Sequence, residues 1–334
     1  MLLAGAAVLA GCGGGHTATP MGNGTSTTAA GTGTASPTTS TPAPTTTGGA
    51  NRATGSRPDA PPAVPVHGAY LGAWLHPTAP TSGQSAFAEQ QATVGSVLAA
   101  TGRPLALLHV YARWSRPAPV SELRAVVGDG SVPILDWGCG PDVSTLASGG
   151  DDTTITAYAD ALKGFEGPVF LRWCWEMNLV GLHPQVGGPA AFVSAWDHIR
   201  TLFREAGASN VSFVWCPGLT GVDPAPYFPG ATEVDWIGVD GYSRTPGETF
   251  GSLFSTFVHT WQGEGKPLMV AETGAAGSAQ PSYIDSIGAD APGLPAVKAV
   301  AYFDAPGPAE AWQFTPAGLL AFGRLAASPY FHPE

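Results

Sequence analysis

The sequence has 334 residues and a formal net charge of −11 at pH 7, and only 12% of its residues are Asp, Glu, Lys or Arg. Residues 67–334 hold 12 basic and 24 acidic side chains. This acidic balance makes the domain a poor candidate for binding nucleic acid or anionic lipid surfaces. The same 268 residues are enough for one large domain with a full hydrophobic core.

The amino-terminal stretch has the pattern of an export signal. Residues 2–10 are apolar but too few to span a bilayer as a helix. The tetrad 9–12, LAGC, resembles the lipobox of bacterial lipoproteins, which implies cleavage after residue 11 and a lipid on Cys12. An ordinary secretory signal with an incidental cysteine is the alternative. Both interpretations predict an extracytoplasmic protein, either lipid-anchored to the cell membrane or secreted.

Residues 12–66 are almost wholly Thr, Gly, Ala, Ser and Pro. Such a composition has too little apolar surface to offset the entropy of ordering the chain. We therefore predict a disordered linker over 12–66, which holds a single folded domain, 67–334, away from a surface.

Eight short apolar runs follow, each with the length and the Val, Ile or aromatic content of a β-strand. Helix-patterned segments fill most of the gaps, while 219–234 is irregular. The runs are 68–75, 105–114, 132–140, 168–178, 210–218, 235–243, 266–274 and 297–306, and the helical segments are 85–101, 119–128, 152–165, 189–207, 249–262 and 316–327.

This alternation over about 250 residues predicts an α/β fold of the (β/α)8 TIM-barrel type. A doubly wound open sheet is the competing architecture, but no Gly-rich phosphate turn follows the first run. Active sites of TIM barrels lie at the carboxyl ends of the strands. Polar residues gather at those ends in this sequence: Asp136, Glu176, Asp240, Tyr242, Glu272 and Asp304.

Two of these residues form a pair of carboxylates. Glu176 ends the fourth predicted strand and Glu272 ends the seventh. Strands three apart in an eight-strand ring face one another across its mouth, so the two side chains can converge. One carboxyl can then protonate the leaving oxygen of a glycosidic bond while the other attacks the anomeric carbon. The alternative for either residue alone is a structural ion pair.

Arg172 is a charged residue inside an apolar strand. Alternation along the strand places Arg172, Cys174 and Glu176 on the barrel-facing side and starts Trp175 on the other. A buried guanidinium is costly unless it is paired. We predict that Arg172 pairs with Glu272 as the charged nucleophile. A nearby cation lowers a carboxyl pKa and burial among aromatic residues raises one, and such a split separates nucleophile from acid.

The segment RWCWEMN resembles the acid/base motif of glycoside hydrolase family 26, the β-mannanase-type retaining enzymes with a (β/α)8 barrel. That motif reads roughly Arg-x-x-His-Glu-Met-Asn, and the family nucleophile lies in a strand-end Glu-x-Gly. The likeness runs from about residue 70 to 325. The positions that match are Arg172, Glu176, Met177 and Asn178, followed by Glu272, Thr273 and Gly274.

The resemblance implies a role for each matching residue. Glu176 would be the acid/base and Glu272 the nucleophile, with Tyr242 donating a hydrogen bond to the nucleophile. Trp312 would form the aromatic floor of a sugar subsite. Trp175 stands where the family has a His that contacts sugar hydroxyls, so Trp175 must stack on the sugar instead, or that contact is lost.

The activity implied is that of a retaining endo-β-glycosidase, acting on β-mannan or a related β-glycan by double displacement. Alternatives on the same scaffold are a β-1,3/1,4-glucanase, a β-1,3-xylanase, a hydrolase of the organism's own exopolysaccharide and a catalytically silent carbohydrate-binding barrel. Fold analogy alone does not choose among them. We expect a monomer whose partner is a polysaccharide, with no cofactor and, since no residues have metal-ligand spacing, no metal.

Tryptophan rings near strand ends either stack on pyranose rings or pack in the core. We predict sugar contact for Trp137, Trp175 and Trp312, and core positions for Trp74 and Trp236. Other residues near the site carry predictions as well. Arg172 and Asn178 are predicted to bind substrate. His109 either contacts sugar or is a core histidine. Asp136 and Asp240 are predicted to accept hydrogen bonds behind the site, and no role is assigned to Asp304 or His183.

Three cysteines lie in the predicted domain: Cys139, Cys174 and Cys216. In an exported protein they allow one disulfide and one free thiol. The spacing does not decide which two residues pair.

Overall fold

A computed structural model describes residues 60–76, 86–305 and 311–333 of the chain. The predicted signal peptide, Cys12 and most of the predicted linker lie outside the described residues. The last residues assigned to the linker do contact the barrel. Pro62 and Pro65 are buried, and the hydroxyl of Tyr70 donates to the carbonyl of Ala63 over 3.0 Å. The folded part therefore begins before residue 67.

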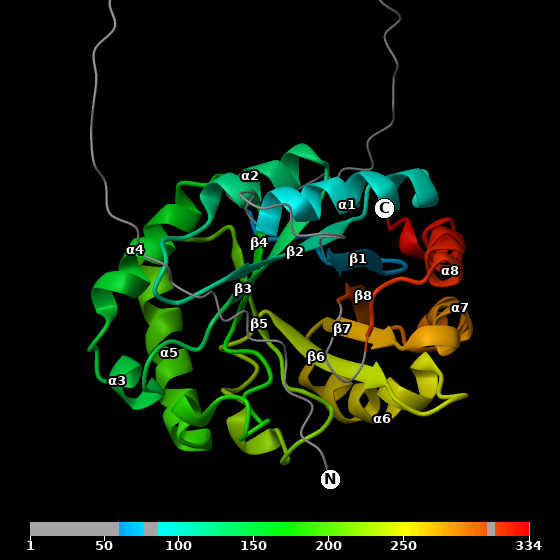
Figure 1. Cartoon of the computed structure of the whole chain (residues 1–334). Coiled ribbons are helices and arrows are strands. Elements are labelled where there is room, and N and C mark those ends of the chain that lie inside the picture. Colours follow the sequence, from blue (N-terminus) through cyan, green and yellow to red (C-terminus); the bar gives the residue numbers. More distant parts are fainter. Residues whose placement is uncertain (1–59, 77–85, 306–310, 334) are drawn as a thin grey trace, which may run out of the picture. The chain divides into compact units, whose positions relative to one another are not determined.

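Eight parallel strands form a closed barrel in which each strand pairs with its neighbours in chain order and β8 pairs with β1 (Figure 1). This is the predicted (β/α)8 fold, and each strand falls within the range predicted for it or ends one residue beyond. The strands are β1 (Tyr70–Leu75), β2 (Leu107–Ala112), β3 (Val132–Trp137), β4 (Val169–Trp173), β5 (Val211–Trp215), β6 (Trp236–Ser243), β7 (Leu268–Ala275) and β8 (Val297–Asp304).

Helices occupy most of the connections between strands. Two of them were not predicted: α3 is a single short turn of helix, and α7 has its apolar periodicity interrupted by Pro281 and Gly288. No helix among the described residues has both the length and the apolarity to cross a bilayer. The helices are α1 (Ala86–Thr101), α2 (Val120–Gly128), α3 (Val143–Ala147), α4 (Asp152–Lys163), α5 (Pro189–Ala206), α6 (Phe250–Trp261), α7 (Gln280–Asp290) and α8 (Pro316–Ala326).

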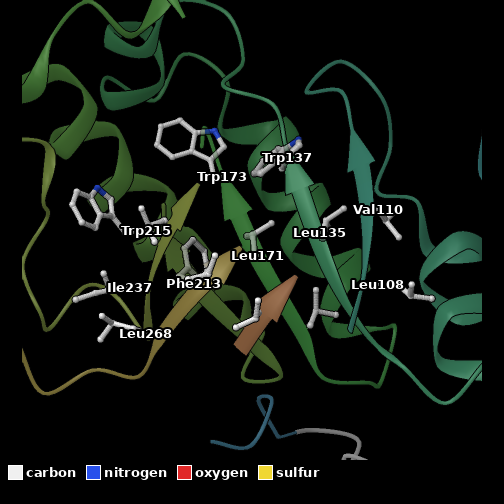
Figure 2. Close-up of a cluster of buried hydrophobic side chains, with 14 of the residues drawn as sticks. Leu108, Val110, Leu135, Trp137, Leu171, Trp173, Phe213, Trp215, Ile237 and Leu268 are labelled. Carbon is white, nitrogen blue, oxygen red and sulfur yellow. The ribbon is translucent and has the colours of Figure 1, made fainter. Parts of the chain in front are cut away.

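The core has two parts, one between the strands and the helices (Figure 2) and one inside the barrel. Trp236 lies in the inner part, as predicted. The prediction of sugar contact for Trp137 is wrong, because residue 137 falls on the outer face of β3. Its ring is fully buried between the rings of Trp114 and Tyr158, with both centroid distances 4.1 Å.

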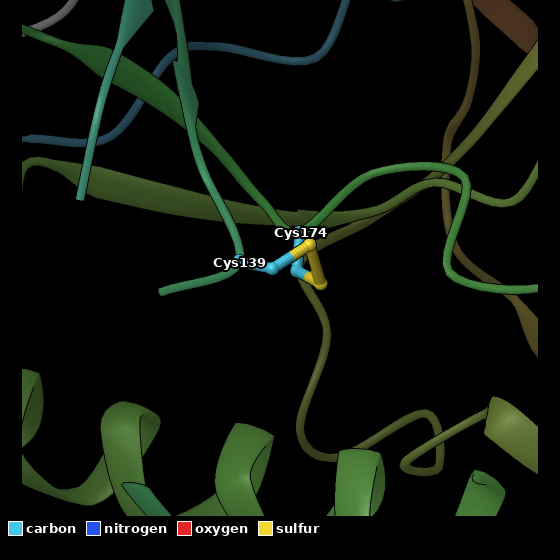
Figure 3. The surroundings of a disulfide bond; sticks show 2 residues. All are labelled: Cys139 and Cys174. Atoms are coloured by element: carbon cyan, nitrogen blue, oxygen red, sulfur yellow. A yellow bond between two sulfur atoms is a disulfide. The ribbon is translucent and has the colours of Figure 1, made fainter. Parts of the chain in front are cut away.

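The strand alternation predicted for 168–178 fails at Cys174. Strand β4 ends at Trp173, and the backbone of Cys174 has a φ of +49°, in the left-handed region. Such a conformation costs a non-glycine residue about 1–3 kcal/mol. Cys174 consequently faces the outer core, where it forms a disulfide with Cys139 (Figure 3), while Trp175 packs against the inner one. Cys216 is a buried free thiol.

A second irregularity occurs in β7. Val270 pairs with Val239, but the next pair joins Glu272 to Asp240, so Ala271 is an extra residue in the strand. Ala271 packs inside the barrel, and the hydroxyl of Thr273 bonds to Tyr283 of α7 on the outside. Bulges of this kind re-aim side chains next to active sites. Here the bulge lets Glu272 point into the barrel directly after the inward Ala271.

We expect Asn210→Ala to lower the free energy of unfolding by about 1–3 kcal/mol. The buried amide of Asn210 joins α4 to the start of β4 by donating to the carbonyls of Leu162 (2.9 Å) and Gly167 (2.7 Å). Urea denaturation measures the change. The control is Thr201→Ala, which removes a similar bond at an exposed site and should cost no more than about 0.5 kcal/mol. Equal losses in the two variants would contradict the assignment.

Candidate active site

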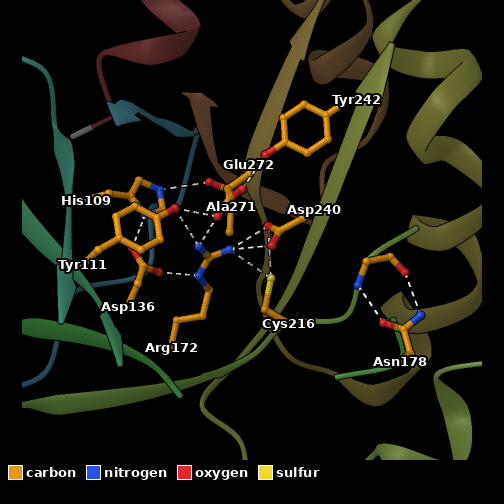
Figure 4. Close-up of polar contacts among 11 residues, drawn as sticks. His109, Tyr111, Asp136, Arg172, Asn178, Cys216, Asp240, Tyr242, Ala271 and Glu272 are labelled. Atoms are coloured by element: carbon orange, nitrogen blue, oxygen red, sulfur yellow. Dashed lines mark hydrogen bonds and ion pairs between the residues drawn. The ribbon is translucent and has the colours of Figure 1, made fainter. Parts of the chain in front are cut away.

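The guanidinium of Arg172 lies inside the barrel, fully buried, and three carboxylates surround it (Figure 4). Nε donates to Asp136, Nη1 donates to Asp240 over 2.7 Å, and Nη2 donates to Glu272. The predicted pair between Arg172 and Glu272 is therefore confirmed, and Asp136 and Asp240 accept hydrogen bonds as predicted. The expectation that Arg172 itself binds substrate is wrong, because its side chain has no exposed surface.

Two phenols complete the surroundings of the Glu272 carboxylate. Tyr111 of β2 donates to Oε1 over 2.6 Å, and Tyr242 of β6 donates to Oε2. The bond from Tyr242 is the one that the resemblance implied. Tyr111 also accepts a bond of 3.2 Å from Arg172 Nη2, so it is held in place from two sides.

These contacts keep Glu272 ionised. Its burial alone would raise the pKa of the carboxyl, but the charge of Arg172 and the hydrogen bonds from Arg172 and Tyr111 outweigh burial and lower the pKa below its ordinary value. Asp240 shares the same guanidinium, and burial raises its pKa. The pKa shifts of Glu272 and Asp240 thus run in opposite directions, and the contacts of Glu272 favour its ionised form.

Glu176 has the opposite environment. Glu176 follows β4 and is the second residue of this turn with a left-handed backbone, with a φ of +55°. Its backbone amide donates to the carbonyl of Cys216 over 2.7 Å. Only 8% of the residue is exposed. Burial, with the neighbouring charge of Glu272, raises the pKa of Glu176 to about 8. At neutral pH Glu176 therefore carries a proton and Glu272 does not.

Asn178 was predicted to bind substrate, and the structure shows a different role. The two N–H groups of its buried amide are shared among the carbonyls of Gly218 (2.9 Å), Thr220 (3.1 Å) and Val222 (3.0 Å), and its oxygen accepts from the amide of Gly218 over 2.8 Å. A Cβ placed on Gly218 would lie 3.5 Å from Oε1 of Glu176. Asn178 therefore holds the backbone after β5 against the acid/base candidate and has no surface left for a sugar.

His109 is the core histidine of the two alternatives considered, with 1% of its surface exposed. Its Nε2 lies 2.9 Å from the carbonyl of Ala271, which can only accept, and its Nδ1 lies 2.6 Å from Asp136. The substrate-binding role predicted for His109 is therefore wrong. Its ring instead ties β2 and β3 to the bulged residue of β7.

A chain of aromatic rings lies beside the two glutamates, and most of its members are partly buried. Trp74, predicted as core, belongs to it: its ring stacks on Phe303 with centroids 4.9 Å apart and meets Tyr111 at 5.7 Å. The chain runs in space through His183, Trp175, Tyr111, Trp74, Phe303, Tyr242 and Trp312, with neighbouring centroids between 4.7 and 6.0 Å apart. We call this set the aromatic belt.

Trp175 and Trp312, the two remaining tryptophans predicted to contact sugar, both lie in the aromatic belt. Trp175 is half-buried, whereas Trp312 is 7% exposed and stacks on Tyr242 at 4.7 Å. Sequence reasoning missed Tyr111, Trp74 and Phe303. The signal for Tyr111 was available, because it lies two residues after the inward-facing His109 and so shares its face of β2.

Asp304 is a buried support for the loop after β8. Its Oδ1 accepts from the backbone amide of Phe314 over 2.6 Å, and burial raises its pKa to about 6. Among the described residues, no group of three or more His, Cys, Asp or Glu side chains is arranged to hold a metal ion.

The fold and the site together define a (β/α)8 barrel with two buried carboxyl groups, whose pKa values shift in opposite directions, at the carboxyl ends of its strands. Solved structures share this fold. A GH26 β-mannanase from Bacteroides ovatus superposes with a TM-score of 0.58 at 14% identity, covering 79% of this chain and 90% of its own. The mannanase man26 of Bacillus subtilis gives 0.56 at 17% identity, covering 76% and 84%. At these identities the likeness establishes the fold.

Two curated proteins are similar in sequence. Endoglucanase H of Acetivibrio thermocellus is 26% identical over 231 residues, which are 63% of this chain and 24% of that protein. Beta-1,3-xylanase TXYA of a Vibrio species is 27% identical over 139 residues, 40% of this chain and 29% of that protein. The matched parts thus span about a quarter of each relative's length. No protein-family profile matches the sequence.

We expect Tyr111→Phe to move the acidic limb of the pH dependence of kcat/KM to higher pH by about one unit. The substitution removes a donor that stabilises the ionised form of Glu272, so the lowered pKa of this carboxyl rises towards its ordinary value. The matched control is Tyr158→Phe, since the buried hydroxyl of Tyr158 has no hydrogen-bond partner within 60–76, 86–305 and 311–333. An acidic limb that stays in place in Tyr111→Phe would contradict the assignment.

Proposed function

We propose that the protein is a retaining endo-β-glycosidase with Glu176 as acid/base and Glu272 as nucleophile. The observation that carries the proposal is the difference in surroundings of two buried carboxyl groups at the mouth of one barrel: Glu272 is held by Arg172 and two phenols, whereas burial dominates at Glu176. Glycoside cleavage by double displacement needs one protonated and one ionised carboxyl. The similarity to an endoglucanase and a xylanase in sequence, and to β-mannanases in fold, supports the same class of reaction.

In the first step the proton of Glu176 moves to the glycosidic oxygen as the bond to the anomeric carbon breaks. The carboxylate of Glu272 forms a bond to that carbon, which gives a covalent glycosyl ester. Tyr242 and Tyr111 hold both oxygens of Glu272 before the step and so fix the direction of attack. Arg172 stays buried behind the carboxylate and keeps it charged.

In the second step the Glu176 carboxylate takes a proton from water as the water oxygen attacks the anomeric carbon. The ester bond to Glu272 breaks, and Glu176 is protonated again. Two displacements at the same carbon release a sugar with the original β configuration. Proton nuclear magnetic resonance of the first product formed shows whether the configuration is retained.

The aromatic belt favours a polymeric β-glycan as the substrate. Its partly buried rings come from β1, β2, β6 and β8 and from the segment after β4, and aromatic faces can pack against the apolar faces of pyranose rings. We propose β-mannan as the first substrate to test, because the β-mannanases named above share the fold. Mixed-linkage β-glucan and β-1,3-xylan follow, because the sequence relatives carry endoglucanase and β-1,3-xylanase names.

The experiment offers the protein glucomannan, galactomannan, mixed-linkage β-glucan, β-1,3-xylan and β-1,4-xylan and measures new reducing ends. We expect release from one of these classes and its loss in Glu272→Ala. Glu176→Ala should lower kcat by about 10²- to 10⁴-fold on polysaccharide, with a smaller loss on aryl glycosides whose leaving group needs no proton. Binding of glycan with no release by the unchanged protein would favour the silent carbohydrate-binding barrel.

The pH dependence gives an independent prediction. Activity requires a protonated Glu176, whose pKa is raised to about 8, so kcat/KM should fall as pH rises through about 8. Glu272 has a lowered pKa, so the acidic limb should lie below the ordinary range of a glutamate. A basic limb near the ordinary glutamate pKa would show that Glu176 is not the acid.

A proposal for the location rests on the sequence alone. We propose that the chain is exported and tethered through a lipid on Cys12. Growth with labelled palmitate, followed by membrane fractionation of the natural protein and of Cys12→Ser, tests this. Label that persists in Cys12→Ser would contradict it.

A further inference from the structure

The turn after β4 places the acid/base candidate, and its backbone is unusual. Cys174 and Glu176, both non-glycine residues, have φ values of +49° and +55°. Conformations of this kind persist only where the surrounding structure fixes them. The segment 174–176 therefore depends on contacts outside itself.

The contacts at the Glu176 end are hydrogen bonds. The amide of Glu176 donates to the carbonyl of Cys216 over 2.7 Å, and Asn178 binds the backbone that follows β5. These bonds hold Glu176 against β5. They do not determine which way the side chain of Cys174 faces.

The contacts at the Cys174 end are one hydrogen bond and one covalent bond. The amide of Cys174 donates to the carbonyl of Trp137 over 2.9 Å, and its sulfur is bonded to Cys139 (Figure 3). Cys139 follows β3 and Cys174 follows β4, two strands that pair directly. Both residues are buried in the outer core, with 3% and 0% exposed, so the bond is enclosed by the helices and strands around it.

We propose that the Cys139–Cys174 disulfide is a positioning element for the acid/base, because it holds Cys174 outward so that Trp175 and Glu176 face the barrel mouth. Regular alternation would turn Cys174 inward and Trp175 outward. The disulfide opposes that rearrangement by fixing the sulfur on the outer side. It touches neither substrate nor the reacting atoms, and the inference rests on the function proposed for Glu176.

The inference predicts a particular defect. Without the disulfide, Glu176 loses its enclosed position and gains water, so its raised pKa falls towards the ordinary value and less of it carries the proton at neutral pH. Proton donation to the leaving group should suffer, while attack by Glu272 should not. If the disulfide only stabilised the fold, its removal would lower the unfolding temperature and leave the chemistry of the folded fraction unchanged.

The experiment compares the natural chain with Cys139→Ala/Cys174→Ala, in which neither partner thiol remains to pair wrongly. We expect kcat to fall at least about tenfold, and the basic limb of kcat/KM to move down by about one pH unit. The loss should shrink on aryl glycosides with acidic leaving groups. Val258→Ala, in the same outer core but on α6, is the control for lost stability and should show neither change.

A second variant tests the backbone argument. Glycine adopts left-handed φ values without a steric cost, so Cys139→Ala/Cys174→Gly should recover part of the kcat lost in the alanine pair. If the alanine pair does not fold, the single variant Cys139→Ala, which breaks the bond and leaves the side chain of Cys174 unchanged, is measured with the same two readouts.

The outcomes separate the two proposals. Absence of activity in the natural chain on every glycan overturns the proposed function before any variant is made. An active natural chain whose disulfide-free form keeps both its basic limb and its leaving-group dependence overturns the positioning role and leaves Glu176 as the acid. A basic limb shifted in the alanine pair but not in Val258→Ala supports the positioning role.

Discussion

The buried charge of Arg172 is the constraint on which the arrangement of the site depends. A guanidinium without access to water is tolerable only when anions and acceptors surround it, and removing one partner leaves an uncompensated buried charge. Arg172 meets this requirement with carboxylates from β3, β6 and β7. Four strands of the barrel are thereby tied to one cation, and the position of the proposed nucleophile follows from the electrostatics of the core.

The difference between the two glutamates comes from backbone geometry, because both are the same residue type and both are buried. The bulge at Ala271 carries Glu272 inward until it reaches Arg172 and two phenols. The left-handed turn after β4 leaves Glu176 in the same mouth but hydrogen-bonded to β5 through its backbone. Burial therefore dominates the pKa of Glu176, whereas the cation and donors dominate that of Glu272.

The sequence predicted what depends on periodicity, and it failed where the backbone leaves the regular pattern. Eight apolar runs located all eight strands, and strand-end acids located Glu176 and Glu272. The outward orientation of Cys174 and the inward orientation of Trp175 were not predictable, because they need one left-handed residue that no local sequence signal marks. Trp137 and Asn178 were misassigned for another reason. Their residue types are suited to sugar contact, but only the packing shows whether any of the side chain remains accessible to a sugar.

Trp175 connects these constraints to the proposed chemistry. Its ring lies over the guanidinium of Arg172, with the carbon at the centre of the charge 5.3 Å from the ring centroid. The rings of Trp175 and Tyr111 meet in an edge-to-face arrangement with centroids 5.4 Å apart. An aromatic face attracts a cation and also excludes water from it. Where water is excluded, each charge acts more strongly on its neighbours. A tryptophan at this position therefore strengthens the hold of Arg172 on Glu272, in addition to any contact it makes with a sugar, and a hydrogen-bonding side chain here would admit water to the same charges.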